Sequence, residues 1–504
     1  MADQLFIGMD NGTQGTKCVI FSRKNAKIIA SSYAPHELIS NNAGRREQAP
    51  QWWIAAATTV LKKCLSAPGV DRAQVVAIGV SGQQHGFVAL DRAGCVLRPA
   101  KLWCDTETVP QCEQITAALG GQKKAIAAMG NAVAVGFTAS KVLWLKQHEF
   151  ALYKRLATIL LPHDFLNFWL TGRRCTECGD ASGTAYFDVR KRKWSQKLLL
   201  AMEASGKLSG CVPEVIDADE PVGFLRPEIA KQFGLPENVL VSSGGGDNMM
   251  AAIGTGNVAP GVVTASLGTS GTIYSHAEKP IVDPRGELAA FCSSTGDWLP
   301  LVCTMNVTVA TELTRKLFGQ ALTAFNADVE RAPVGAGGLR LLPYFNGERT
   351  PALPKAHATL SGMNGTNFSR ANVCRASMEG ATIGLRYGLD VLRRQGIAPK
   401  EIRLVGGGAK SRVWRQIVAD VFNCPVVCPT SAEAGAMGGV LQAMWCVDHA
   451  TGGNGSLQDL CAKFIRLDSS TRAEPAATRA RTYDAIYAEH LALNTAMAAL
   501  PALP

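Results

Sequence analysis

The chain has 504 residues, of which 47% are hydrophobic and 18% are charged, and its formal net charge at pH 7 is +10. A chain of this length can bury more than one hydrophobic core, so we expect two or more domains and exclude a disordered or coiled-coil protein. The 51 lysines and arginines are scattered rather than gathered on one segment, which argues against nucleic-acid binding.

The sequence predicts a reduced, cytoplasmic protein. No uncharged apolar run approaches the length of a membrane-spanning helix, so we expect no membrane association. The N-terminal residues lead directly into an apolar run, without the basic and apolar regions of a signal peptide. The 15 cysteines are irregularly spaced, and the single C-x-x-C pair at Cys175 and Cys178 lacks the further ligands that a zinc site needs.

Two apolar strand-like runs, residues 5–9 and 17–21, flank a turn at residues 10–16. The glycines of this turn expose backbone N–H groups and its threonines supply hydroxyls, a combination that can hold phosphate oxygens. Asp10, at the end of the first strand, could hold hydrated Mg²⁺, which prefers carboxylate and phosphate oxygens. Taken alone, such a stretch is more often an ordinary β-hairpin.

The strand-like run at residues 75–80 leads into Gln84 and His85, with glycines on either side. Polar groups just beyond the C-terminal end of a strand are typical of a ligand site in an open α/β sheet. These two side chains offer donors and acceptors for a polyhydroxy ligand, although His85 could also be a loop histidine satisfied by its neighbours. Trp103 and Asp105 likewise lie at the end of a strand-like segment that leads into polar residues.

Residues 239–254 form the stretch around which the chain is organised. An apolar run breaks into three glycines and restarts as a small-residue helix that begins with Asp247 and Asn248. Asp and Asn at a helix start accept hydrogen bonds from the first-turn N–H groups. A carboxylate at such a strand-to-helix turn can also accept a proton from a substrate hydroxyl. Helix cap and general base both stay open at this point.

The pattern G-T-x-G-T occurs twice, starting at Gly12 and at Gly268, about half the chain length apart. A repeat on this scale predicts two related domains, residues 1–256 and 257–504, each with a phosphate-facing hairpin near its start. A further strand, residues 402–405, ends in glycines before a helix and could place a nucleotide near the helix start. Neither a P-loop nor a dinucleotide-binding fingerprint occurs, which argues against a Rossmann dehydrogenase.

Together these segments resemble the FGGY carbohydrate kinases, from about Ile7 to about Trp445. Residues 136–148 (GFTASKVLWLKQH) fit the first signature of that family, and residues 358–379 fit the second. The resemblance implies an α/β, actin-like ATPase fold: two duplicated ribonuclease-H-like domains with a cleft between them, which binds ATP and a sugar. Many family members dimerise, so a homodimer stays open, although no interface signature is evident in the sequence.

The resemblance also implies roles for individual residues. Asp247 matches the base that deprotonates the sugar hydroxyl, and Asp10 matches a residue that acts near Mg²⁺. The implied sugar-binding residues are Gln84, His85, Trp103, Asp105, Asp247 and Asn248. The implied ATP-binding residues are Thr13, Gln14, Gly268, Thr269, Gly407, Gly408 and Ala409.

The implied reaction is ATP-dependent phosphorylation of D-xylulose to D-xylulose 5-phosphate, a step of xylose catabolism. Two departures lie in the implied sugar site: Gln84 stands where many relatives have Met, and residues 104–107 read Cys-Asp-Thr-Glu where relatives often read Trp-Asn-Asp followed by Arg. Another family kinase, acting on ribulose, a hexulose or a sugar alcohol, is therefore an alternative. A non-kinase actin-like ATPase is a further one, but the C-terminal tail is too short for the peptide-binding domain that it would need.

Overall fold

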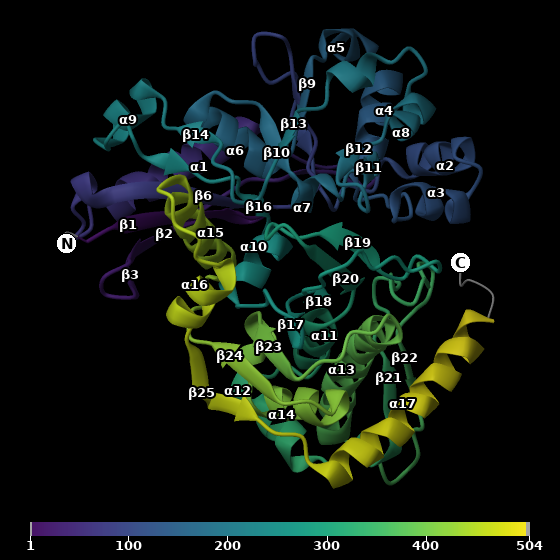
Figure 1. The fold of residues 1–504 in the computed structure, drawn as a ribbon. Helices are drawn as coiled ribbons and strands as arrows, with labels where there is room; N and C mark the ends of the chain where they lie inside the picture. Colours follow the sequence, from purple (N-terminus) through teal and green to yellow (C-terminus); the bar gives the residue numbers. More distant parts are fainter. Residues whose placement is uncertain (1–2, 500–504) are drawn as a thin grey trace. The chain divides into compact units, whose positions relative to one another are not determined.

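The computed structural model describes residues 3–499 and divides the chain into two compact units (Figure 1). Unit 1 contains Met1–Val258, His276–Pro300 and Glu433–Ile465, and unit 2 contains Ala259–Ser275, Leu301–Ala432 and Arg466–Pro504. The chain thus passes between the units several times, and the segment Glu433–Ile465 packs with the N-terminal residues. The division into domains 1–256 and 257–504 stays a prediction.

Unit 1 is built on a seven-stranded sheet in the order β14-β15-β6-β1-β2-β3, with β16 paired to β6. Its strands are β1 (Leu5–Asn11), β2 (Gly15–Ser22), β3 (Lys27–Pro35), β6 (Val75–Gly82), β14 (Gly223–Phe224), β15 (Leu240–Val241) and β16 (Gly245–Gly246). Strands β1 and β2 form the predicted antiparallel hairpin, and β1 runs parallel to β6. The N-terminal hairpin prediction is confirmed.

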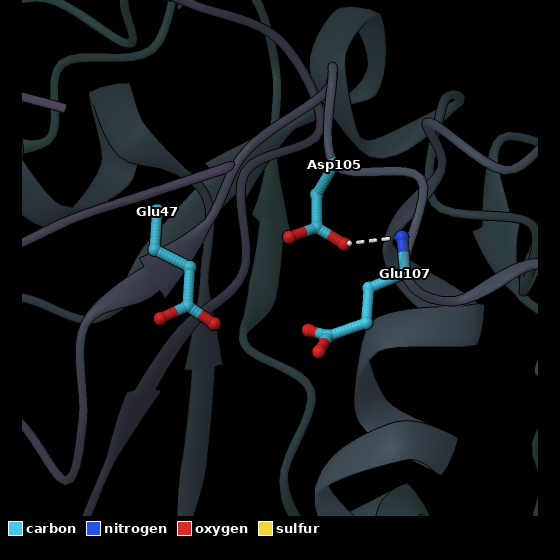
Figure 2. A group of neighbouring side chains, drawn as sticks. All are labelled: Glu47, Asp105 and Glu107. Carbon is cyan, nitrogen blue, oxygen red and sulfur yellow. Dashed lines mark hydrogen bonds between the residues drawn. The ribbon is translucent and has the colours of Figure 1, made fainter. Parts of the chain in front are cut away.

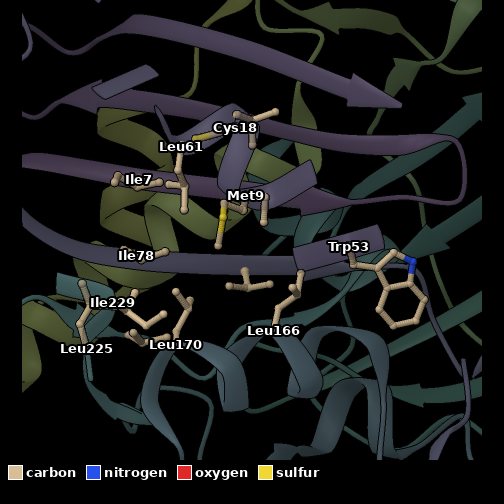
Figure 3. Packing of buried hydrophobic residues seen from close by; sticks show 14 of the residues in the cluster. Ile7, Met9, Cys18, Trp53, Leu61, Ile78, Leu166, Leu170, Leu225 and Ile229 are labelled. Carbon is tan, nitrogen blue, oxygen red and sulfur yellow. The ribbon is translucent and has the colours of Figure 1, made fainter. Parts of the chain in front are cut away.

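Side chains along the strands alternate between two hydrophobic cores. Ile7 and Met9 face the core that contains helices α1 (Pro50–Leu65) and α6 (Pro162–Thr171) (Figure 3). Phe6 faces the opposite core, which contains α10 (Asp247–Gly254), α15 (Ala434–Ala450) and α16 (Leu457–Phe464). Because successive strand residues point to opposite faces, the sheet is covered by helices on both sides. This is the α/β layering expected from the sequence.

Helix α15 lies against the sheet at a distance that only glycine permits. A Cβ at Gly8 of β1 would lie 2.0 Å from the carbonyl oxygen of Ala436, and a Cβ at Gly79 of β6 would lie 2.0 Å from that of Gly439. Gly438 approaches helix α10 equally closely, since its Cβ would lie 1.9 Å from the carbonyl oxygen of Met250. Because glycine has no side chain, the backbone of α15 contacts the backbones of the sheet and of α10 directly.

Smaller elements complete unit 1. Strands β4 (Ile39–Ser40), β5 (Arg46–Gln48) and β8 (Ala100–Lys101) form one small sheet, and β7 (Val88–Leu90) pairs with β9 (Thr158–Leu160). The other pairs are β10 (Cys175–Glu177) with β13 (Glu214–Ile216) and β11 (Phe187–Asp188) with β12 (Lys193–Trp194). The remaining elements are α2 (Val109–Ala118), α3 (Gln122–Met129), α4 (Thr138–His148), α5 (Phe150–Arg155), α7 (Cys178–Ala181), α8 (Gln196–Met202), α9 (Pro227–Phe233) and β19 (Ala289–Cys292).

Unit 2 repeats the central topology of unit 1. Its strands follow the order β20-β18-β17-β23-β24-β25. They are β17 (Val262–Leu267), β18 (Gly271–Ser275), β20 (Trp298–Thr304), β23 (Glu401–Val405), β24 (Val426–Pro429) and β25 (Leu467–Ala473). Strand β17 is antiparallel to β18 and parallel to β23, which is the relation of β1 to β2 and β6. The shared topology agrees with the predicted internal repeat.

Five helices and a short hairpin accompany this second sheet. They are α11 (Thr308–Leu317), α12 (Leu322–Arg331), α13 (Arg370–Arg394), α14 (Arg412–Phe422), α17 (Ala477–Ala498) and the pair β21 (Arg340–Leu342) and β22 (Thr359–Ser361). Within residues 3–499, no helix combines the length and apolar character needed to cross a membrane.

The glycine contact of α15 yields a stability prediction. Gly438→Ala forces a methyl group against the backbone of Met250, so we expect the free energy of unfolding to fall by about 1–3 kcal/mol, the usual range for overpacking. Gly455→Ala is the control, because a Cβ there meets no atom within 4 Å. Urea unfolding of both variants measures the difference. Equal midpoints would show that the helix can move away at little cost.

Candidate active site

The segments that follow three parallel strands of unit 1 meet at one edge of its sheet. Ser81 of β6 lies opposite Asp10 of β1 on one side and opposite Gly245 of β16 on the other. Because these strands run in the same direction, the residues just beyond their C-terminal ends gather at that edge, where α/β sheets bind ligands. The structure therefore brings Asp10, the Gln84 loop and Asp247 to a common place.

Helix α15 holds the turn that leads to Asp247. Gly244 has a φ of +70°, a backbone conformation that favours glycine. The buried side chain of Gln442 accepts a hydrogen bond from the Gly244 N–H at 2.8 Å and donates one to its carbonyl at 2.9 Å. This double pairing fixes the bend before α10. Gln442 was not predicted, because it lies 198 residues from its partner and no local pattern marks it.

Asp247 is the first residue of α10 and is half-buried. Its Oδ1 accepts two hydrogen bonds from Asn248, from the backbone N–H at 2.9 Å and from Nδ2 at 3.1 Å. In the described part of the chain, Oδ2 accepts none. The N-cap position belongs to Gly246, so the side chain of Asp247 does not act as the N-cap of this helix. One oxygen is thus fixed and the other is left for a ligand.

Burial raises the pKa of Asp247 to about 8, and the negative charges of Asp10 and Asp180 add to the shift. The two hydrogen bonds from Asn248 oppose it. A carboxyl group that titrates near neutral pH can both accept and release a proton, which is what a general base requires.

Gln84 connects to this carboxyl through Asn248. Its buried side chain accepts a hydrogen bond from Asn248 Nδ2 at 2.7 Å, and its own Nε2 lies 3.0 Å from the sulfur of Met249. A Cβ at Gly246 would lie 2.7 Å from Cγ of Gln84, so the glycine makes room for this side chain. Gln84, Asn248 and Asp247, all predicted site residues, therefore form one hydrogen-bonded chain.

His85 is held in the left-handed backbone region, with a φ of +62°. Its ring lies 4.9 Å from the Phe137 ring and 5.3 Å from the Phe291 ring, and it occupies the space where a side chain at Gly183 would stand. Its backbone N–H donates to Oδ1 of Asp180 at 3.2 Å, and its Nδ1 lies 3.3 Å from the same oxygen. The ring orientation is thus set from several sides.

Asp180 is itself part of a buried charge cluster. Its Oδ2 pairs with Nδ1 of His163 at 3.1 Å, and Nε2 of His163 lies 2.9 Å from Oδ1 of Asp164. Burial disfavours the charged form of Asp180, but the histidines outweigh this and lower its pKa to about 2. His163 and Phe291 were not predicted site residues, because their relevance depends on contacts between distant segments.

Asp10 lies at the end of β1, where Oδ1 accepts a hydrogen bond from Ser81 Oγ at 2.7 Å. Its carboxyl group rests on Gly435 of α15, where a Cβ would lie 2.7–2.8 Å from the carboxyl atoms. Burial raises its pKa, while Lys17, which lies opposite it in the hairpin and pairs with Glu433 at 2.8 Å, opposes the shift. The negative charge of Asp10 contributes to the raised pKa of Asp247, so two carboxyl groups interact at this edge. Such a pair makes the edge a suitable site for a divalent cation.

The first hairpin is tied to the Trp103 turn. Thr13 Oγ1 donates to Oε1 of Gln83 at 3.0 Å and accepts a hydrogen bond from Trp103 Nε1 at 2.9 Å. Gln14 is exposed, and its carbonyl accepts hydrogen bonds from the hydroxyl of Tyr33 and the N–H of His36, each at 2.9 Å. A predicted phosphate residue, Thr13, therefore contacts a predicted sugar residue, Trp103.

Asp105 has an unexpected environment. It is fully buried beside Glu47 and Glu107 (Figure 2), and its oxygens accept hydrogen bonds from the N–H of Arg46 at 2.8 Å, the N–H of Glu107 at 3.1 Å and Lys101 Nζ at 3.3 Å. The three carboxylates are close enough to hold a metal ion. The ammonium of Lys101 contacts all three, since it also lies 3.0 Å from Glu47 and 2.5 Å from Glu107, and Glu47 pairs in addition with Arg45 at 2.6 Å and with Arg98 at 2.7 Å. Asp105 anchors the Trp103 turn, and its contact with a sugar stays a prediction.

Unit 2 brings its own predicted residues together. Gly268 and Thr269 form the turn between β17 and β18, and their carbonyls accept hydrogen bonds from the N–H groups of Thr308 and Val307 at 2.9 and 3.0 Å. Gly407, Gly408 and Ala409 form the turn before α14, and a Cβ at Gly408 would lie 2.8 Å from Cβ of Leu267. The glycine turn thus packs against the base of the hairpin. Exposed N–H groups near a helix start suit a phosphate.

The raised pKa of Asp247 predicts an effect on stability. Since its folded-state pKa of about 8 lies above the unfolded value, the carboxyl destabilises the fold progressively as the pH rises from about 4 to about 8. We expect Asp247→Asn to raise the free energy of unfolding at pH 8 by about 1–3 kcal/mol, after allowing for partial solvation, with little change at pH 4. Thermal unfolding at both pH values measures this. The exposed control Asp217→Asn should change neither midpoint, and a loss of stability in Asp247→Asn at pH 8 would contradict the explanation.

Comparison with known proteins identifies the family of this fold and site. Residues 5–254 match the N-terminal domain of the FGGY family of carbohydrate kinases, and residues 263–447 match its C-terminal domain. A xylulose kinase from Haemophilus influenzae is 45% identical over 491 residues, which cover 97% of this chain and 99% of the relative. A xylulose kinase from Bacillus subtilis is 34% identical over 503 residues, with coverage of 97% and 98%.

A solved structure agrees with these relatives. The xylulose kinase from Rhodospirillum rubrum superimposes with a TM-score of 0.88 at 27% identity, over 98% of this chain and 99% of that one. The similarity confirms the two-domain α/β fold of the actin-like ATPase class that the sequence predicted. The chain therefore belongs to the FGGY family of carbohydrate kinases.

Proposed function

We propose that this sugar kinase transfers the γ-phosphoryl group of ATP to D-xylulose and releases D-xylulose 5-phosphate and ADP. Family membership makes the chain a phosphotransferase that acts on a carbohydrate with ATP as donor. The substrate follows from relatives of nearly equal length that are xylulose kinases. The observation that carries the mechanism is the half-buried Asp247, whose pKa is raised to about 8 beside Gln84 and Asn248.

Asp247 acts as the general base. Asn248 holds its Oδ1, so Oδ2 is the oxygen that takes the proton from the sugar hydroxyl. The hydroxyl oxygen then forms a bond to the γ-phosphorus while the bond between that phosphorus and the oxygen of ADP breaks. Phosphoryl transfer depends on positioning and charge stabilisation rather than on covalent catalysis, so one oriented carboxylate is sufficient protein chemistry.

Asp10 is the residue that would hold Mg²⁺, whose positive charge neutralises phosphate oxygens during transfer. Thr13 and Gln14 in unit 1, and Gly268 and Thr269 in unit 2, are proposed to contact the phosphates. The turn formed by Gly407, Gly408 and Ala409 is proposed to contact the nucleoside. These assignments rest on glycine-rich turns that expose N–H groups and on a buried carboxyl group, both of which suit anionic phosphate and its cation.

The sugar is proposed to lie against His85, Gln84, Asn248 and Trp103, with Asp105 as a further contact. The packing of His85 between Phe137 and Phe291 fixes one wall of this site. A second sugar is kept as an alternative because Gln84 stands where many relatives have Met: ribulose, a hexulose or a sugar alcohol. Cytoplasmic location and a homodimeric state stay predictions.

Sugar-dependent ADP release tests the substrate. We expect D-xylulose to give a kcat/KM at least tenfold above that of D-ribulose, L-ribulose, D-fructose, D-arabitol and glycerol when each is supplied with Mg-ATP. A site whose polar groups match one stereochemistry leaves groups unpaired with another, which supports discrimination of this size. Preference for another sugar would support the kinase activity but contradict D-xylulose as the substrate. ADP release without any sugar dependence would reject the kinase itself.

The pH profile tests the base. Because Asp247 must be deprotonated to accept a proton and its pKa is raised to about 8, we expect kcat/KM for the sugar to fall as the pH drops below about 8. Asp247→Asn should lower kcat by about 10²–10⁴-fold, the usual contribution of a general base, while ATP binding measured by calorimetry is retained. Asp217→Asn is again the matched control. Near-normal turnover in Asp247→Asn would reject its role.

A further inference from the structure

Unit 1 buries two lysines completely, and they have opposite environments. Lys101 lies among three carboxylates, Glu47, Asp105 and Glu107 (Figure 2 shows the carboxylates). Lys141, on helix α4, donates instead to two backbone carbonyls, that of His85 at 2.7 Å and that of Gly136 at 2.6 Å. Among the described residues, it makes no ion pair. An ammonium group desolvated without a paired carboxylate is costly, so the contact calls for an explanation other than fold stability.

The first carbonyl belongs to the strained residue of the sugar site. His85 adopts a φ of +62°, which a residue other than glycine keeps only when its surroundings enforce it. Its N–H is held by Asp180 at 3.2 Å, and its carbonyl is held by Lys141 and by Thr138 Oγ1 at 3.2 Å. The peptide groups on both sides of His85 are therefore fixed, and Lys141 makes the shortest of these contacts.

The second carbonyl belongs to the segment that leads into α4. A Cβ at Gly136 would lie 2.7 Å from the carbonyl oxygen of Trp103, so this segment packs directly on the Trp103 turn. The next residue, Phe137, places its ring 4.9 Å from the ring of His85. One ammonium group thus fastens two segments that carry or support proposed sugar contacts.

We propose that Lys141 is a positioning residue of the sugar site, whose ammonium holds the His85 loop and the Gly136 segment in the arrangement that binds the sugar. The inference rests on the proposed function, because it assigns the loop to sugar binding. Burial lowers the pKa of Lys141 to about 7 although the carboxylate of Asp105 opposes the shift, which agrees with a charge that the fold does not compensate. We therefore assign Lys141 the role of positioning these two segments, not of stabilising the fold.

Lys141→Met tests this inference, since methionine fills a similar volume and cannot donate a hydrogen bond. We expect the KM for D-xylulose to rise at least tenfold, the KM for ATP to stay within twofold, and the thermal midpoint to stay unchanged or rise. Lys141→Gln, whose amide can still donate to one carbonyl, should give an intermediate KM for the sugar. Lys101→Met is the matched control: it removes the ammonium that contacts all three carboxylates, of which only Glu47 has further pairs, with Arg45 and Arg98, among the described residues. Its thermal midpoint should therefore fall steeply.

Two results would overturn the inference. The first is an unchanged KM for the sugar in both Lys141 variants. The second is a fall in the thermal midpoint of Lys141→Met as large as that of Lys101→Met, which would make Lys141 a stability element. Failure of the proposed function is a separate result, because it is seen in the wild type as absence of D-xylulose-dependent ADP release. A wild type that is active on D-xylulose and variants that bind it equally well would reject the role of Lys141 alone.

Discussion

The close approach of helix α15 to strands β1 and β6 is the constraint on which the catalytic edge of unit 1 depends. Glycines at both surfaces remove the side chains that would hold helix and sheet apart. The same helix supports the carboxyl of Asp10 through Gly435 and fixes the bend before Asp247 through Gln442. Two carboxyl groups that come from distant parts of the chain are therefore positioned by one rigid element. A site built in this way has little freedom to relax, which is the preorganisation that phosphoryl transfer needs.

The charges around a buried group distinguish the supporting residues from those proposed to react. Lys101 and His163 are buried with opposite charges around them, and such groups hold loops in place. Asp247 and Asp10 are half-buried and make no ion pair among the described residues, so their pKa values rise, although the nearby Lys17 opposes the rise for Asp10. Unbalanced carboxyl groups at one edge favour a cation and a proton donor as ligands. These raised pKa values reduce the stability of the fold at this edge, and any ligand that binds only the folded state there would restore it.

Local sequence patterns located the residues at strand ends but not the residues that hold them. Asp10, Gln84 and Asp247 follow apolar runs, and the structure places them together because the strands are parallel. Gln442 and Phe291 could not be predicted, since each acts through a contact with a segment far away in the chain. Asp105 shows the reverse case. Its position after an apolar run indicated a ligand contact, yet its side chain points toward Lys101, because a strand end alone does not determine which way a carboxylate turns.

Gln84 connects the proposed sugar site to the proposed base, Asp247. Its amide oxygen accepts a hydrogen bond from the same Nδ2 of Asn248 that donates to Oδ1 of Asp247. A thioether at this position would be a much weaker acceptor, so Asn248 would lose the partner that orients its amide. Replacing Gln84 would therefore change the support of the proposed base as well as the shape of the proposed sugar site. With these proposed roles, a substitution at Gln84 acts on kcat and on sugar affinity together, so this position is not an independent determinant of which ketose is phosphorylated.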